Sequence, residues 1–277
     1  MTHNEVTLDA GVVFTPGTVD ADGFTVRYEV AGEGPDLIAL HGAGGFSHGS
    51  GGFTHSRGID LLTAGNRVYL VELPGFGQER NERTADGRDM ARTVLAIADA
   101  LGLAEFALLG TSMGGVVASW AAVLAPRRLT RLVLEVPGAF RPDGSDPSKL
   151  SPEQMARAFH AHPERKTIVP ADPAHIAAIW PLVERIMGPL HDIDLERSLA
   201  DVHTPTLVLT GTADGLFGTE VGRTYRRIMP NATFAIVYDA AHDLSGDRPE
   251  AFAAIVGDFL QRGSEFVIED RSTLIYP

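Results

Sequence analysis

The segment from Phe106 to Ala118 constrains the fold of this chain most strongly, because a strand-like run turns into a helix-like run at a serine. The apolar residues Phe-Ala-Leu-Leu lead into the pattern Gly-x-Ser-x-Gly, which is centred on Ser112 and followed by small and β-branched residues. Glycine on both sides lets neighbouring backbone approach without a Cβ clash. We therefore predict a sharp strand-to-helix corner, which holds the Ser112 hydroxyl above the sheet near the positive end of the helix.

Other short apolar runs along the chain predict further strands. They show little alternation between apolar and polar residues, which is typical of a parallel sheet covered by helices on both faces. Helical periodicity occurs between several of these runs. The predicted strands are 37–40, 68–71, 106–109, 132–134, 207–209 and 234–237, and the predicted helices are 90–101, 113–124, 220–229 and 249–260. This order predicts an α/β fold with a mostly parallel, doubly wound sheet.

The first 30 residues predict an antiparallel pair of strands that precedes this alternation. Residues 6–14 and 24–30 are rich in β-forming residues, and the Pro-Gly and Asp-Gly pairs between them are typical of turns. The tail Glu265–Pro277 also contains β-forming residues. It either packs locally or pairs with another subunit, and the sequence leaves both open.

Residues 138–203 break the alternation of strands and helices. The segment is rich in Pro, Asp and His and has no convincing buried strand, and the stronger of its two helical stripes spans 176–187. We predict a small helical cap at 138–203, inserted into an α/β core formed by 1–137 and 204–277. The stronger stripe, which contains Trp180, either packs on the core or lines a substrate pocket.

The charge and the residue types exclude several classes of function. The chain has 36 acidic and 23 basic residues, hence a formal net charge of −13, which repels nucleic acid and anionic membranes. It has no cysteine, so thiol nucleophiles, disulfides and cysteine-ligated metals are excluded. No zinc-binding or nucleotide-binding pattern occurs. We therefore expect no metal, no other cofactor and no nucleic-acid partner.

The N-terminal residues lack the basic and apolar regions of a signal peptide. No apolar run approaches the roughly 18 residues of a membrane span. We therefore expect a cytoplasmic protein that acts on a small molecule and has no membrane partner. Its oligomeric state is left open.

Two residues that follow later strands suit catalysis with Ser112. A serine hydroxyl needs an adjacent base to become a nucleophile, and that base needs a group to orient it. Asp214 and His242 each come just after a predicted strand, and the carboxyl ends of parallel strands meet at the edge where open α/β sheets bind substrates. We predict His242 as the base and Asp214 as the orienting acid. Glu135, which also ends a predicted strand, is the rival acid.

A second glycine-rich segment, residues 41–45, follows the predicted strand 37–40. It is either a flexible turn or part of an oxyanion hole, in which the backbone N–H groups of Ala43 and Met113 stabilise a developing negative oxygen. The residues that we expect to line the substrate site are mostly aromatic. They are Gly42, Phe46, Phe76, Phe140, Trp180 and Phe217.

With these residues identified, the chain resembles the α/β-hydrolase superfamily over nearly its whole length. The matching features are the His-Gly pair at 41–42, the loop 71–77, the Gly-x-Ser-x-Gly around Ser112, the Gly-Thr-Ala-Asp ending at Asp214 and the Ala-His ending at His242. The resemblance implies the α/β-hydrolase fold and a Ser-His-Asp triad.

Within the superfamily, Ser-Met-Gly-Gly together with a helical cap is similar to the hydrolases that cleave carbon–carbon bonds of ring-fission products. Thr111 and Asp243 stand where those enzymes usually carry Asn and Trp. Haloperoxidase-like esterases are also similar in their triad. We predict a serine hydrolase of a small carboxylic ester or lactone. The alternatives are a carbon–carbon bond hydrolase of a keto or dienone substrate, and a ligand-binding receptor on a hydrolase scaffold.

Overall fold

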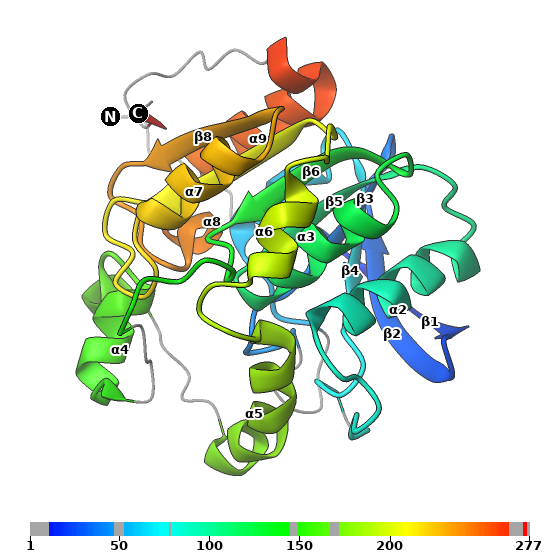
Figure 1. Cartoon of the computed structure of the whole chain (residues 1–277), viewed down its shortest axis with the longest axis horizontal. Coiled ribbons are helices and arrows are strands. Elements are labelled where there is room, and N and C mark those ends of the chain that lie inside the picture. The colour runs from blue at the N-terminus through cyan, green and yellow to red at the C-terminus, as the bar shows by residue number, and fades with distance from the viewer. Residues whose placement is uncertain are drawn as a thin grey trace, which may run out of the picture.

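The described strands form one mixed sheet in the order β1-β2-β4-β3-β5-β6-β7-β8-β9 (Figure 1). The computed structural model describes residues 11–46, 53–77, 79–144, 149–166, 172–265 and 274–275. The strands from β3 to β8 pair in parallel, whereas β1, β2 and β9 pair antiparallel with their neighbours. The strands are Thr15–Ala21 (β1), Phe24–Ala31 (β2), Asp36–Leu40 (β3), Arg67–Val71 (β4), Phe106–Thr111 (β5), Leu129–Glu135 (β6), Thr206–Gly211 (β7), Ala232–Val237 (β8) and Leu274–Ile275 (β9).

Helices cover both faces of this sheet, which confirms the predicted doubly wound architecture (Figure 1). Helices α2, α3 and α7 pack on one face, and α1 and α9 pack on the other. The helices are Arg57–Leu62 (α1), Gly87–Ala100 (α2), Met113–Leu124 (α3), Pro152–Phe159 (α4), Pro173–Met187 (α5), Ile193–Leu199 (α6), Glu220–Ile228 (α7), Leu244–Asp247 (α8) and Pro249–Arg262 (α9), with 3₁₀ turns at Pro163–Arg165 (η2) and Gly263–Glu265 (η3).

Strand β3 shows why the central strands lack polar alternation. Successive side chains of a strand point to opposite faces of the sheet. Leu37 and Ala39 enter the apolar layer beneath α1 and α9, whereas Ile38 and Leu40 enter the layer beneath α2 and α3. Because both faces are covered, all four side chains are buried and apolar residues are needed at every position.

The position predicted for the first strand was wrong. β1 includes Pro16 and Gly17, which we expected in a turn, and pairs with β2 in a register that places Pro16 opposite Glu29. β1 lies at the edge of the sheet, where proline is tolerated because its missing N–H need not pair. Asp22 and Gly23 do form the turn between the two strands, both with positive φ. Residues 6–10 lie outside the described residues.

The four helices predicted in the core are confirmed, and α3 has the predicted bounds. Helices α1 and α6 were not predicted, since six and seven residues are too few to show a clear period. In the C-terminal tail, the two-residue strand β9 pairs antiparallel with β8 of the same chain.

The predicted insertion at 138–203 lies between β6 and β7 and contains α4, η2, α5 and α6. Helix α6 packs on α3, and α5 contacts both α2 and α3. The end of α4 reaches the loops that follow β7 and β8: the carbonyl of Ala158 accepts the N–H of Gly215 at 3.3 Å, and the carbonyl of Phe159 accepts the N–H of Asp243 at 2.7 Å. Whether 138–203 behaves as a separate cap stays a prediction. Within the described ranges, none of the helices has the length and apolar character required to cross a membrane.

Replacing two helical glycines by alanine should change the free energy of unfolding in opposite directions. A Cβ at Gly222 of α7 would overlap the buried Phe234 ring of β8, whereas a Cβ at Gly257 of α9 would meet nothing within 4 Å. We expect Gly222→Ala to lower the free energy of unfolding by about 1–2 kcal/mol, because overpacking outweighs the gain in helix propensity. Gly257→Ala should raise it by about 0.5–1 kcal/mol. Urea denaturation measures both changes, and the same sign for both would contradict this account of the packing.

Candidate active site

Ser112 lies at the corner between β5 and α3, in a conformation that only its surroundings can hold. Its backbone has φ 52° and ψ −110°, and positive φ in a residue other than glycine costs of order 1–3 kcal/mol. The Ser112 N–H donates to the carbonyl of Glu135 at 2.9 Å, and the Ser112 carbonyl accepts the N–H groups of Gly115 and Gly138 at 3.0 and 2.8 Å. These bonds fix the backbone and leave the hydroxyl available for other contacts.

The glycines of the motif are required by close backbone approach. A Cβ on Gly114 would lie 2.6 Å from the carbonyl oxygen of His41 and 2.7 Å from that of Leu40. A Cβ on Gly110 would overlap the carbonyl of Gly114 itself. The start of α3 therefore packs directly on the end of β3, and any larger residue would push the two apart.

The structure brings Ser112, His242 and Asp214 together from three separate loops. His242 Nε2 lies 2.9 Å from Ser112 Oγ, and His242 Nδ1 lies 3.3 Å from each carboxylate oxygen of Asp214. The His242 side chain is 4% exposed and that of Asp214 is fully buried. Asp214 Oδ1 also accepts the N–H groups of Leu216 and Phe217, which hold the carboxylate in place. In this arrangement Nε2 is able to accept the hydroxyl proton while Asp214 sets the tautomer of the ring.

Glu135, the rival acid, is used differently. Its buried carboxylate accepts the Thr111 hydroxyl at 2.6 Å and the N–H of Ser245 at 2.8 Å. Burial raises the pKa of Glu135, although these donors act in the opposite direction. Glu135 thus holds the residues around the corner, and the carboxylate beside the His242 ring is that of Asp214.

The predicted oxyanion donors lie next to Ser112. Met113 begins α3, so its N–H has no acceptor within the helix. Ala43 lies in a turn closed by a hydrogen bond from Gly45 N–H to Gly42 C=O, and a Cβ on Gly42 would lie 3.3 Å from that of Ser112. Their role as an oxyanion hole stays a prediction.

The side chain of His41 contacts this turn and the loop after β4, a role that the sequence did not reveal. Its Nδ1 lies 2.7 Å from the carbonyl of Gly42, and its Nε2 accepts the N–H of Leu73 at 3.1 Å. The rings of Phe46 and Phe76 pack edge-on against the His41 ring, with centroids 5.1 and 4.8 Å away. Phe46 and Phe76 therefore contribute to the support of this turn. That they line the substrate site stays a prediction.

The other aromatic candidates lie in different surroundings. Phe217 packs edge-on against the His242 ring at 4.8 Å, whereas Phe140 packs against the Tyr225 ring at 5.1 Å. Trp180 is 36% exposed, and its indole N–H donates to Glu184 one turn along α5. Phe159, which was not among the predicted site residues, contacts the His242 ring at 5.1 Å. Its position at the end of α4 could not be placed from the helical stripe alone.

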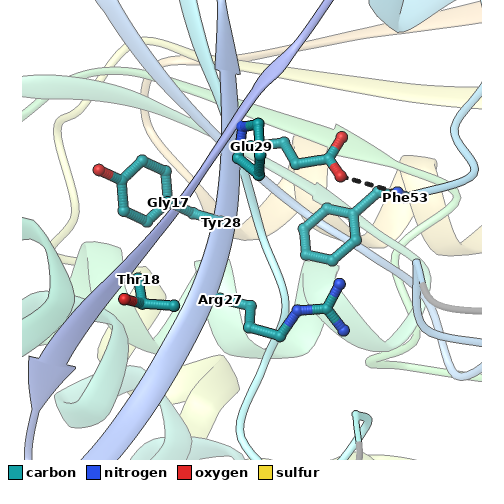
Figure 2. Close-up of a pocket in the computed structure, with 7 residues that line it drawn as sticks. Gly17, Thr18, Arg27, Tyr28, Glu29 and Phe53 are labelled. Carbon is teal, nitrogen blue, oxygen red and sulfur yellow. Dashed lines mark hydrogen bonds between the residues drawn. The ribbon is translucent and has the colours of Figure 1, made fainter. Parts of the chain in front are cut away.

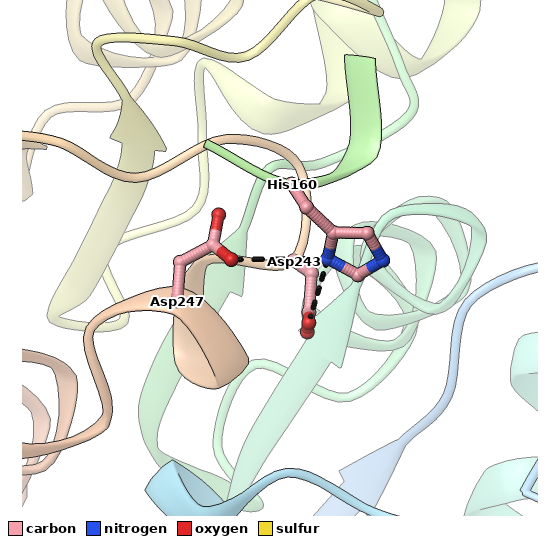
Figure 3. Close-up of side chains that lie close together, drawn as sticks. All are labelled: His160, Asp243 and Asp247. Atoms are coloured by element: carbon pink, nitrogen blue, oxygen red, sulfur yellow. Dashed lines mark ion pairs between the residues drawn. The ribbon is translucent and has the colours of Figure 1, made fainter. Parts of the chain in front are cut away.

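A charged cluster beside His242 connects the segment after α4 to the loop after β8 (Figure 3). His160, Asp243 and Asp247 offer three ligand atoms within 4.8 Å of one another. The ammonium of Lys166 lies 2.8 Å from the Asp243 carboxylate and 2.7 Å from that of Asp247. The Lys166 ammonium thus already occupies the space between the two carboxylates. A divalent ion could bind there only by displacing it.

A shallow pocket lies elsewhere, on the hairpin of β1 and β2 (Figure 2). Its volume is about 260 Å³. Its floor includes Glu29, whose buried carboxylate accepts the N–H of Phe53 at 2.9 Å, and Arg27, whose guanidinium lies over the Phe53 ring at 5.2 Å. The lining residues are Pro16, Gly17, Thr18, Arg27, Tyr28, Glu29 and Phe53, none of which is a candidate site residue.

Comparison with known proteins places these features in a family. The family model described as the alpha/beta hydrolase fold matches residues 35–179. The chain is 28% identical to a pimeloyl-[acyl-carrier protein] methyl ester esterase of Photobacterium profundum, covering 84% of this chain and 98% of that protein. It is 26% identical to a 2-hydroxy-6-oxo-6-phenylhexa-2,4-dienoate hydrolase of Comamonas testosteroni, covering 88% and 93%. A solved meta-cleavage product hydrolase of Pseudomonas fluorescens superposes with a TM-score of 0.74 at 19% identity, covering 88% and 97%.

Replacing each of the two buried acids near Ser112, Asp214 and Glu135, by its amide should distinguish their roles. In Asp214→Asn the amide favours the wrong tautomer of His242, so the rate at which a fluorophosphonate labels Ser112 should fall by about 10³–10⁴-fold. In Glu135→Gln the rate should stay close to that of wild type, since Glu135 does not touch the ring. A larger loss in Glu135→Gln than in Asp214→Asn, with both variants folded, would show that the acids have been assigned the wrong way round.

The charged cluster should make stability depend on pH. Contact with the carboxylate of Asp243, and to a lesser extent with that of Asp247, raises the pKa of His160 to about 9. Because the pKa is raised in the folded state, this stabilisation is complete below about pH 6.5 and is lost as the pH rises through 9. We expect the free energy of unfolding to fall between pH 7 and pH 9.5 more steeply in wild type than in His160→Gln. Denaturant titrations at several pH values measure both slopes, and equal slopes would contradict the pairing.

Proposed function

We propose that this chain, which belongs to the α/β-hydrolase fold family, is a serine esterase that cleaves a small carboxylic ester or lactone through an acyl-enzyme. The observation that carries the proposal is the 2.9 Å contact between His242 Nε2 and Ser112 Oγ, with Asp214 on the other ring nitrogen. The nucleophile is thus adjacent to its base, and the base is oriented by a buried acid.

In the proposed reaction, Ser112 Oγ attacks the ester carbonyl as its proton passes to His242 Nε2. The N–H groups of Ala43 and Met113 stabilise the oxyanion of the tetrahedral intermediate. His242 then protonates the departing alkoxide, which leaves an acyl group on Ser112. A water molecule, deprotonated by His242, attacks this acyl group and releases the acid, and the proton returns to Ser112.

The surroundings of His242 support an uncharged substrate with apolar groups. The rings of Phe159 and Phe217 pack edge-on against the imidazole, and Phe159 is 37% exposed, so part of an apolar side chain beside His242 is available for contact. The net charge of −13 also disfavours polyanionic substrates.

Carbon–carbon bond cleavage by the same three residues is the second candidate. It is supported by the similarity to the dienoate hydrolase of Comamonas testosteroni and by the shared Ser-Met-Gly-Gly. The positions that depart from that subfamily are engaged in other contacts, because Thr111 donates to Glu135 and Asp243 binds Lys166. Thr111 replaces the usual Asn, and a charged carboxylate stands where those hydrolases carry the aromatic Trp, which makes ester cleavage the preferred proposal.

The proposal is tested with Ser112→Ala on a panel of methyl and aryl esters, lactones and dienones. We expect wild type to hydrolyse esters or lactones, and we expect the variant to lose at least about 10⁴-fold in kcat/KM, because the nucleophile is gone. Ser198→Ala is the matched control and should keep the wild-type rate, because the Ser198 hydroxyl donates to the carbonyl of Asp194 within helix α6 and Ser198 is not a candidate site residue.

Two outcomes would overturn this assignment. Equal ester hydrolysis by wild type and Ser112→Ala would exclude Ser112 as the nucleophile. Turnover of dienones alone, dependent on Ser112, would select the carbon–carbon bond hydrolase instead.

A further inference from the structure

Asp247 carries a nearly buried carboxylate that contacts two separate segments of the chain. It ends the short helix α8, and its side chain is only 3% exposed. One oxygen, Oδ2, accepts the N–H of Ala241 and the N–H of Ala161, each at 2.9 Å. The other oxygen, Oδ1, lies 2.7 Å from the ammonium of Lys166. A single side chain thus joins the loop after β8 to the segment that follows α4.

These contacts bracket His242 on both sides. Ala241 is the residue before His242 and is held by Asp247. Asp243 is the residue after it, and its N–H donates to the carbonyl of Phe159 at 2.7 Å. The ring of Phe159 itself packs on the imidazole. The backbone of the loop that carries His242 is therefore hydrogen-bonded on both sides of this residue.

The charge of the carboxylate is maintained by its partners. Burial acts to raise the pKa of Asp247, but contacts with His160 and Lys166 and the two backbone N–H bonds hold it well below its usual range. His160 Nδ1 lies 3.7 Å from Asp247 Oδ1 and 3.2 Å from Asp243 Oδ2. Figure 3 shows these three side chains close together. Both cations come from the segment after α4. The ionised clamp consequently depends on that segment being docked.

We propose that Asp247 is a positioning residue for His242, and that Lys166 acts with it to make the geometry of the His242–Ser112 pair depend on docking of residues 160–166. Neither residue touches the reacting atoms. The inference rests on the proposed function, because it assigns His242 as the base. A misplacement of about 1 Å in such a pair costs on the order of 10²-fold in rate. A clamp on the adjacent backbone therefore has a direct effect on turnover.

The test compares Lys166→Met, which removes the charge but keeps most of the volume, with Lys166→Arg, which keeps the charge. Asp247→Asn is a second disruptive variant. Arg157→Met, which breaks an exposed ion pair with Glu153 on α4, is the matched control. For each we would measure kcat and KM on the best ester, the rate of Ser112 labelling by a fluorophosphonate, and the folded fraction by circular dichroism.

We expect Lys166→Met and Asp247→Asn to lower kcat and the labelling rate by about 10–100-fold while KM changes little, because the base is misplaced and binding is not. Lys166→Arg should restore most of the rate, and Arg157→Met should behave as wild type. Unchanged labelling by folded Lys166→Met would overturn the proposal and leave the cluster a purely structural one. A rise in KM with unchanged kcat would also overturn it.

A readout that does not need turnover separates this inference from the proposed function. The ring nitrogen resonances of His242 are assigned by comparison with His242→Gln in ¹⁵N NMR spectra. We expect these resonances to move in Lys166→Met and to return in Lys166→Arg. If wild type cleaves none of the substrates but the resonances respond in this way, the proposed function fails and the positioning role stands. If they do not respond, the positioning role fails whatever the enzyme cleaves.

Discussion

The close approach of β3 and α3 is the constraint on which the rest of the site depends. Gly114 lies so near the carbonyls of Leu40 and His41 that no side chain fits between them. This contact positions the turn after β3 next to Ser112, and it sets the start of α3. Because β3 and β5 are neighbours in the sheet, the sheet itself contributes to holding the strained conformation of Ser112.

The parallel sheet then supplies the remaining groups. Strands β5, β7 and β8 end at the same edge, so the loops that carry Ser112, Asp214 and His242 converge although they are far apart in sequence. The loops also receive contacts from outside the sheet. Phe159 packs on the imidazole, and the charged cluster around Asp247 connects the same segment to the loop of His242. The chemistry of the sheet edge and the position of the inserted segment are thereby coupled.

The distribution of charge is consistent with this arrangement. The chain as a whole is strongly acidic, yet His160 and Lys166 gather at a pair of carboxylates beside His242. Without such partners, the nearly buried Asp247 and the half-buried Asp243 would repel each other and raise the free energy of the folded state. The cations make it possible for Asp247 to stay ionised and to accept two backbone N–H groups at once.

Local patterns in the sequence determined the architecture and the chemical types at the site. Each of these patterns depends on neighbours within a few residues: strands that are apolar on both faces, helical periods and the Gly-x-Ser-x-Gly corner. The sheet, α3 and the position of Ser112 could therefore be predicted. The edge strand β1 could not, because pairing with β2 overrides the turn preference of Pro16. Asp214 was predicted as the orienting acid from its place after a strand, with Glu135 as the rival. The contact of Asp214 with the ring, and the contacts of Phe159 and Asp247, were shown only by the tertiary structure. They join residues tens of positions apart, and no local pattern encodes which side chains the folded chain brings within a few ångströms of one another.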